Sequence, residues 1–286
     1  MNTATYEHAI VSILNQRIQE DDIDVPMLPE VANRVVQLTR DPDSEASDLA
    51  KLIQSDQALA GHVMRIANSA LYSPNSTLVS LQQAITRLGM QIIADIALAA
   101  SLNSKMFNAP GFEKFIQDNL RYSFLTGLWS KEIARACRKN VETAFLAGLL
   151  HDIGRLVGIQ LVLEVARSLR TKIGATDILT LANHFQRTLG VKVVTQWEMP
   201  TLVCDVVTGF DEPEHAGPSR EQTFAVVAGT IFASHFAPAN KYRTKIELDD
   251  LRAHPSLADL NLYPEDIDKL LAKADIVKTA SESIHS

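Results

Sequence analysis

Apolar residues recur every three or four positions along almost the whole chain, which is the period of amphipathic helices. Ile10, Leu14 and Ile18 show this spacing near the amino terminus, and Phe124 and Leu128 show it again in the middle. Short polar segments rich in proline, glycine, asparagine and aspartate interrupt the pattern and predict turns. These breaks fall at residues 21–29, 41–43, 73–74, 108–111, 139–140, 174–177, 197–200 and 211–218.

The pattern predicts an all-α protein. Residues 224–236 are almost wholly apolar and predict a central buried helix, too short to span a bilayer. Residues 191–194 alternate briefly, but they continue a helical pattern equally well. At the helix ends, Ser47 is a predicted N-cap, and Gly89 and Gly154 are predicted C-terminal caps.

Composition excludes several classes of protein. The 286 residues are 46% apolar and carry a net charge of -7, which argues against a nucleic-acid backbone as partner. Cys137 and Cys204 lie far apart and form no CxxC pair, so we expect a reducing compartment. Because no stretch reaches ~18 uninterrupted apolar residues and the amino terminus lacks a signal-peptide pattern, we expect a cytoplasmic protein without a membrane partner.

The candidate chemistry lies in residues 148–154, where His151 and Asp152 are adjacent at the end of an apolar helix. An imidazole and a carboxylate together can ligate a divalent metal that activates water. The structural interpretation competes with this one. A histidine in the last turn of a helix can bond a free carbonyl, and Asp152 can bond Arg155 or a nearby backbone amide. The sequence favours the structural interpretation.

Several segments, taken in order, resemble the HDOD family, the HD-related output domains of bacterial signalling proteins. The matching segments are residues 28–29, 48–50, 55–56, 65–70, 84–89, 147–154 and 197–200. The resemblance covers roughly residues 25–240. It implies a two-lobed helical fold: an N-terminal helical lobe, residues 1–110, packed on a lobe related to HD metal-dependent phosphohydrolases, residues 111–280. Residues 281–286 are expected to form a frayed tail.

The resemblance also implies which metal ligands are missing. HD phosphohydrolases have an upstream histidine, a central His-Asp pair, further histidines and a downstream aspartate. Here Tyr122 stands at the upstream position, Gln186 at a later histidine, Phe210 and Asp211 at a His-His pair, and residues 228–230 at the downstream aspartate. The metal candidates that remain are His151 and Asp152, joined at most by Asp211. Three ligands are too few for a tight site with open positions for substrate.

Two functions follow. The first is a non-catalytic signalling module that needs no cofactor, acts in trans and binds a signalling protein or a small ligand, with Asn68, Ser69, Tyr122 and Gln186 as candidate contacts. For Asn68 and Ser69, a helix end is the favoured alternative. The second is a phosphohydrolase acting on nucleotides or phosphodiesters, with iron, manganese or magnesium held by His151 and Asp152. The side chains that face His151 discriminate between the two.

Overall fold

The computed structural model describes residues 3–39, 41–75, 77–238, 240 and 242–283. This part of the chain is helical and contains no strand; an isolated bridge pairs Asn240 with Arg243. The predicted all-α class is therefore confirmed. Residues 191–194, whose alternation was compatible with a strand, lie inside the long helix α10 (Ala175–Gln196).

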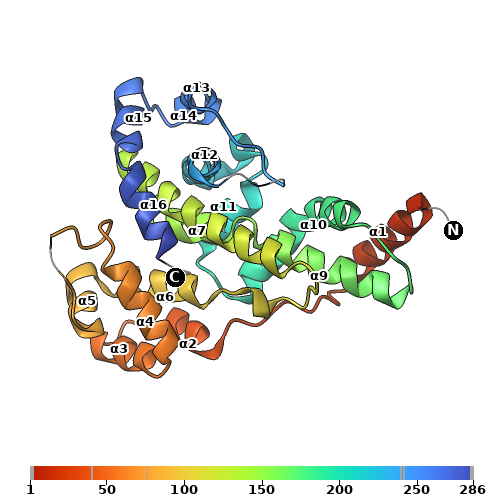
Figure 1. Ribbon diagram of the computed structural model, residues 1–286, viewed down its shortest axis with the longest axis horizontal. Coiled ribbons are helices and arrows are strands. Elements are labelled where there is room, and N and C mark those ends of the chain that lie inside the picture. The colour runs from red at the N-terminus through yellow and green to blue at the C-terminus, as the bar shows by residue number, and fades with distance from the viewer. Residues whose placement is uncertain (1–2, 40, 76, 239, 241, 284–286) are drawn as a thin grey trace.

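Five helices gather at one end of the molecule, drawn in orange in Figure 1. They are α2 (Glu30–Leu38), α3 (Ala46–Gln54), α4 (Gln57–Ala67), α5 (Leu81–Leu88) and α6 (Met90–Ser101). Helix α6 packs against each of the other four. Helices α5 and α6 meet at Gly89 without an intervening loop, and its φ of 93° is open to glycine but strained for other residues, so the predicted cap at Gly89 is confirmed.

The central helices form the second group. They are α7 (Glu113–Ala136), α8 (Val141–Leu150), α9 (Ile153–Ser168), α10, α11 (Thr201–Gly209) and α12 (Arg220–Phe236), with the 3-10 turns η1 (Ser104–Met106), η2 (Pro213–His215) and η3 (Gly217–Ser219). Helix α7 packs against α8 and α12, and α9 packs along α10. Trp129 on α7 stacks on Phe236 of α12, with ring centroids 5.1 Å apart, and residues 224–236 form the predicted buried helix.

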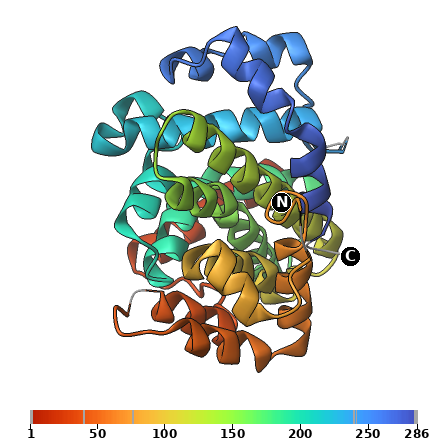
Figure 2. The ribbon, with the colours of Figure 1, turned by 90° about the vertical axis from the view of Figure 1, so that its left-hand side faces the viewer.

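The two ends of the chain both pack on this central group. Helix α1 (Thr3–Gln19) lies against α9 and α10, where Arg17 pairs with Glu164 at 2.8 Å, and not with α2–α6 (Figure 1). Of the last four helices, the first three lie at the end of the molecule away from α2–α6, and the fourth runs back and packs against α7 (Figure 2). They are α13 (Leu248–Arg252), α14 (Pro255–Asp259), α15 (Pro264–Leu271) and α16 (Ala274–Glu282). The boundary at residue 110 stays a prediction; of the expected tail, residues 281–282 belong to α16 and 284–286 lie outside the described residues.

Two predicted helix ends differ from the structure. Helix α3 begins after Glu45, which forms a capping box with Asp48, so Ser47 lies inside the first turn and is not the N-cap. Gly154 is no C-terminal cap, because it lies in the first turn of α9, against α10. A Cβ there would meet the backbone of α10, including Gly190 Cα at 2.7 Å, so the glycine permits two helices to cross closely.

The stretch Val141–Ser168, which joins α8 to α9, is long and apolar enough to cross a membrane by length and composition. In this fold, however, 83% of its most apolar part is buried inside the protein. That burial is what the core of a helical protein requires. The stretch turns at His151 and Asp152, which places the candidate pair at the centre of the second group.

Candidate functional site

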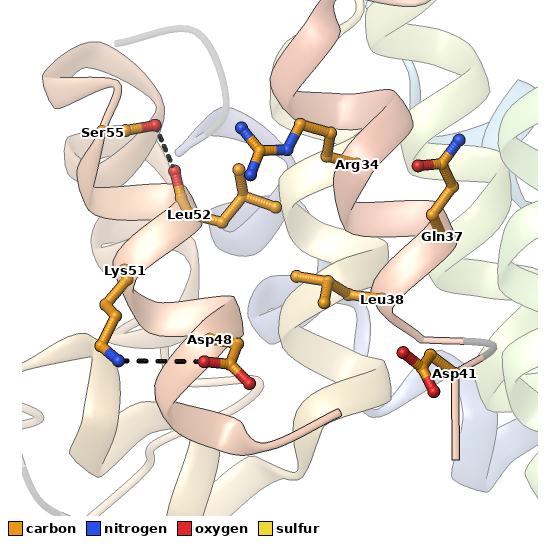
Figure 3. Close-up of a pocket in the computed structure, with 8 residues that line it drawn as sticks. All are labelled: Arg34, Gln37, Leu38, Asp41, Asp48, Lys51, Leu52 and Ser55. Atoms are coloured by element: carbon orange, nitrogen blue, oxygen red, sulfur yellow. Dashed lines mark hydrogen bonds and ion pairs between the residues drawn. The ribbon is translucent and has the colours of Figure 1, made fainter. Parts of the chain in front are cut away.

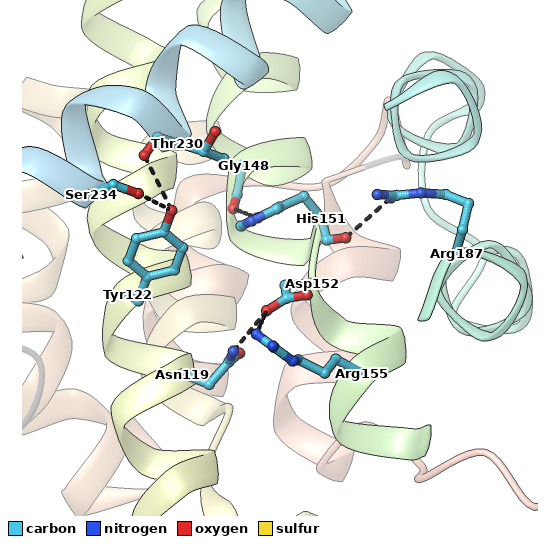
Figure 4. Close-up of polar contacts among 9 residues, drawn as sticks. All are labelled: Asn119, Tyr122, Gly148, His151, Asp152, Arg155, Arg187, Thr230 and Ser234. Atoms are coloured by element: carbon cyan, nitrogen blue, oxygen red, sulfur yellow. Dashed lines mark hydrogen bonds and ion pairs between the residues drawn. The ribbon is translucent and has the colours of Figure 1, made fainter. Parts of the chain in front are cut away.

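His151 lies just after the last turn of α8, and its imidazole is 7% exposed. Nδ1 is 2.7 Å from the carbonyl oxygen of Gly148 and donates its hydrogen to it (Figure 4). Burial lowers the pKa of His151, which keeps the ring neutral. The expected structural role of His151, a bond to a free helix carbonyl, is therefore present in the fold.

Asp152 connects α9 to α7. Its Oδ2 accepts a hydrogen bond from Nδ2 of Asn119 at 2.7 Å and faces Nη1 of Arg155 at 3.5 Å (Figure 4). The contact with Arg155 was predicted. The contact with Asn119 was not, although Asn119 lies one turn before Tyr122 on the same face of α7.

Tyr122 connects α7 to α12. Its hydroxyl donates to the carbonyl of Thr230 at 3.1 Å and lies 2.9 Å from Oγ of Ser234, and its ring centroid is 6.1 Å from that of His151. Burial raises the pKa of Tyr122, so the phenol stays protonated. Tyr122 occupies the position expected for the upstream histidine, and Thr230 lies in the segment expected for the downstream aspartate. The two residues contact each other beside His151, but they offer a phenol and a backbone carbonyl in place of an imidazole and a carboxylate.

Asp211 is held by Arg187, a residue that the sequence analysis missed. The guanidinium forms a two-pronged pair with the Asp211 carboxylate at 2.7 and 2.9 Å, and the same side chain donates to the carbonyls of His151 at 3.2 Å and Val207 at 2.9 Å. It also lies 4.7 Å from the ring centroid of Phe210. The cation lowers the pKa of Asp211. Asp211 therefore balances an arginine and does not join His151 and Asp152 as a third ligand.

Neither Gln186 nor the histidines of α10 and η2 complete a ligand set. Gln186, next to Arg187, makes no hydrogen bond to His151 within the described residues. His184 is exposed and packs edge-on against Phe185, and His215 is 79% exposed and faces Glu212. Across the described ranges, no group of three or more histidine, cysteine, aspartate or glutamate side chains could hold a metal.

Two further arginines approach the same centre. Arg243 stacks on the ring of Tyr122 at 3.3 Å from its centroid, and Arg155 lies 5.5 Å from the ring centroid of Phe115. Arg243 comes from the segment after α12, so nothing in the local sequence pattern indicated it.

These residues do not fit a divalent metal. The centre offers one imidazole and one carboxylate, and Oδ2 of that carboxylate already accepts a hydrogen bond from Asn119. Positively charged side chains, including Arg155, Arg187 and Arg243, surround it. His151, Asp152, Asn119 and Tyr122 are all less than 10% exposed, which leaves no open coordination position for substrate.

Asn68 and Ser69 lie in the first helix group, at the end of α4. The Asn68 amide donates to the carbonyl of Leu78 at 3.0 Å and accepts from its backbone N–H at 2.7 Å. Both functional atoms therefore close the loop between α4 and α5. Oγ of Ser69 is buried without a partner in the described structure. The helix-end interpretation matches this geometry, and ligand contact at either residue stays a prediction.

We expect Asn68→Ala to lower the free energy of unfolding by about 2 kcal/mol, because two backbone groups of Leu78 lose their partner. Urea unfolding followed by circular dichroism measures the loss. Asn68→Asp, which keeps the acceptor and removes the donor, should fall between the wild type and Asn68→Ala. Equal midpoints for all three proteins would show that the loop does not depend on this amide.

A separate groove lies on the surface between α2 and α3, with a volume of about 690 Å³ (Figure 3). Leu38 and Leu52 face it, with Arg34 above and the Asp48–Lys51 pair below, 3.8 Å apart. The groove is open and its charges are mixed, so its geometry favours no single class of ligand.

The HDOD domain model matches residues 25–213. The chain belongs to the HDOD family. The HDOD match includes α2–α6 and continues through the His151–Asp152 turn to α11, whereas α12 and Arg243 lie beyond the matched residues.

Solved structures agree with the HDOD fold. A candidate metal-dependent phosphohydrolase from Shewanella amazonensis SB2B is 22% identical, with a TM-score of 0.75 over 98% of this chain and 100% of that chain. An HDOD domain protein of unknown function from Geobacter sulfurreducens is 19% identical, with a TM-score of 0.67 over 95% of this chain and 98% of the other. At these identities the likeness shows the fold alone.

A relative among curated proteins is an uncharacterised protein of Treponema pallidum, 21% identical over 216 residues. The match includes 72% of this HDOD chain but spans only 41% of the length of that protein.

Proposed function

We propose that this HDOD chain is a non-catalytic signalling module that binds a protein partner or a small ligand. The observation that carries the proposal is the closure of the His151–Asp152 centre by polar side chains. Asn119 and Arg155 both contact Oδ2 of Asp152, and Arg187 donates to the backbone carbonyl of His151. A solved HDOD-like neighbour from Marinobacter aquaeolei VT8, a candidate signal transduction protein with a TM-score of 0.60, supports the same class.

The closed centre supports a mechanical role for these residues. Asp152 ties α9 to α7, Tyr122 ties α7 to α12, and Arg187 ties α10 to the end of α8 and to α11. Each tie is a hydrogen bond between buried or half-buried groups, so each is costly to leave unmade. A centre of this kind holds six helices, α7–α12, in one arrangement, which suits a protein that presents surfaces to a partner.

The alternative is a metal-dependent phosphohydrolase, which the description of the Shewanella amazonensis neighbours favours. It would use His151 and Asp152 and would require the arginines to leave the centre. The geometry of the ligand set favours the signalling module over this alternative.

Hydrolysis of bis(p-nitrophenyl) phosphate with and without manganese tests the proposal. We expect the wild type and His151→Ala to show the same background rate at every manganese concentration, since neither holds a metal-activated water. A manganese-dependent rate at least about tenfold above background that His151→Ala abolishes would establish the hydrolase instead.

A further inference from the structure

A small, partly open cavity of about 160 Å³ lies where α6 meets α2, α8 and the start of α11. One face of α6 lines it, because Gln91, Ala94, Asp95 and Leu98 follow the three-and-four spacing of a helix face. The other lining residues are Val36, Thr39, Leu146, Met199 and Pro200. The cavity therefore joins the first helix group to the second, at a place separate from the His151 centre.

Asp95 gives this cavity an unusual chemical character. Its side chain is buried, with 5% exposure, and one side-chain donor reaches it, Nε2 of Gln91 at 2.8 Å from Oδ1. Within the described residues, no lysine, arginine or histidine nitrogen lies within 4 Å of the carboxylate. Buried carboxylates in proteins are ordinarily paired with a cation, because an unpaired one is costly to hold in an apolar setting.

The charged and titratable groups around Asp95 do not supply the cation that its carboxylate lacks. Lys131 on α7 attracts the carboxylate from a distance, but its ammonium lies over the ring of Tyr72, at 4.6 Å, and does not line the cavity. Glu142 on α8 repels it, and Tyr72, after α4, is a buried neutral phenol. The residues that α2 and α11 place at the cavity are uncharged. Burial dominates, and it raises the pKa of Asp95 to about 7.

We propose that this cavity binds a small organic cation, a primary ammonium or guanidinium group on a short apolar stem. The charged head pairs with Asp95, and the stem packs on Leu98, Leu146 and Met199. At roughly 30 Å³ per water, the space holds about five waters, which matches a stem of four carbons with an amine. Such a group comes either from a free amine or from a lysine or arginine side chain of a partner.

This inference rests on the proposed function, since it names the ligand class that a binding module would take. The signalling proposal and the cation site can be refuted by different experiments. The phosphodiester assay concerns His151, whereas the cation site concerns Asp95, and His151→Ala should leave cation binding unchanged.

Asp95 also makes stability depend on pH. Its pKa is raised from 3.8 to about 7 on folding, so the native state keeps a proton that the unfolded chain has lost. The stability this provides is complete below about pH 4 and is lost as the pH rises through about 7. As the pH rises from 5 to 8, we expect the urea midpoint of the wild type to decrease relative to that of Asp95→Asn. A constant difference between the two proteins across this range would show that Asp95 does not titrate there.

Titration with n-butylammonium chloride, followed by methionine-methyl NMR at pH 8, tests the site directly. The Met199 methyl, assigned with Met199→Leu, should shift saturably, with a dissociation constant in about the millimolar range that a ligand this small allows. Asp95→Asn should weaken binding at least about tenfold, whereas Asp249→Asn, which removes an exposed carboxylate on α13, should not. At pH 6 the wild-type affinity should fall about tenfold from its value at pH 8, as protonation of a group with a pKa of about 7 requires.

1-Pentanol, a neutral alcohol one carbon longer than n-butylammonium, and acetyl-lysine methylamide, a lysine with a blocked backbone, complete the experiment. Pentanol should bind at least about tenfold more weakly than the amine. Binding of the blocked lysine assigns the site to a partner's side chain, and its exclusion while butylammonium binds assigns it to a free amine; either result supports the site. Absence of a saturable shift with butylammonium, equal binding of pentanol, or unchanged affinity in Asp95→Asn would overturn it.

Discussion

Gly154→Ala is expected to lower the free energy of unfolding by about 4 kcal/mol or to prevent folding. The new Cβ would meet the carbonyl of Gln186 and the backbone of Gly190, inside any normal contact distance. Those atoms belong to the backbone of α10 and cannot rotate away as a side chain could. Helices α9 and α10 would have to separate, which would disturb the most extensive helix–helix packing among the described residues. Urea unfolding and the yield of folded protein measure the effect.

Gly61→Ala provides the matched control. Gly61 lies inside α4 and is exposed, and a Cβ there would meet no atom within 4 Å. Alanine should stabilise the helix by about 0.5–1 kcal/mol, since it restricts the unfolded chain and favours helix. Opposite signs for the two substitutions are expected. A Gly154→Ala protein with the wild-type midpoint would show that α9 and α10 do not cross as closely as described.

Arg187→Ala is expected to lower the free energy of unfolding by about 3 kcal/mol. The guanidinium is mostly buried, at 18% exposure, and it satisfies the carbonyls of His151 and Val207 in addition to pairing with Asp211. Alanine would leave both carbonyls without their donor and would remove the contact with the ring of Phe210. Urea unfolding monitored by circular dichroism gives the change in stability.

Asp211→Asn separates the ion pair from the backbone contacts. The Asp211 side chain is 53% exposed, so its charge should contribute only about 0–1 kcal/mol. Arg187 can still donate to both carbonyls in this variant. We therefore expect Asp211→Asn to cost much less than Arg187→Ala. Equal losses would mean that the ion pair, and not the closure of the helix ends, is what Arg187 contributes.

Much of the fold was predictable from the sequence because local periodicity determines which segments become helices. The long apolar segment at residues 224–236 is a buried helix, and the brief alternation at residues 191–194 was outweighed by the helix around it. Two of the positions that the family resemblance assigned to the centre also lie close to His151. Tyr122 and Phe210 both lie beside His151, with ring centroids 6.1 and 5.2 Å away.

The side chains that now close the centre could not be predicted in the same way. Arg187 was overlooked because its neighbour Gln186 occupies the expected ligand position, while helix geometry directs Arg187 to the His151 carbonyl. Arg243 reaches Tyr122 from a segment after α12, a contact that depends on tertiary packing. Gly154 was assigned to a helix end because a glycine signal does not distinguish a cap from a close crossing of two helices.

Metal content is the measurement that tests the central claim most directly. The protein should be expressed with manganese and iron supplied, purified without chelator, and analysed by inductively coupled plasma mass spectrometry beside His151→Ala. The closed, arginine-lined centre predicts that both proteins fold and carry less than about 0.1 tightly held metal per chain. One or two metals per wild-type chain that disappear in His151→Ala would contradict this claim and would favour the phosphohydrolase alternative.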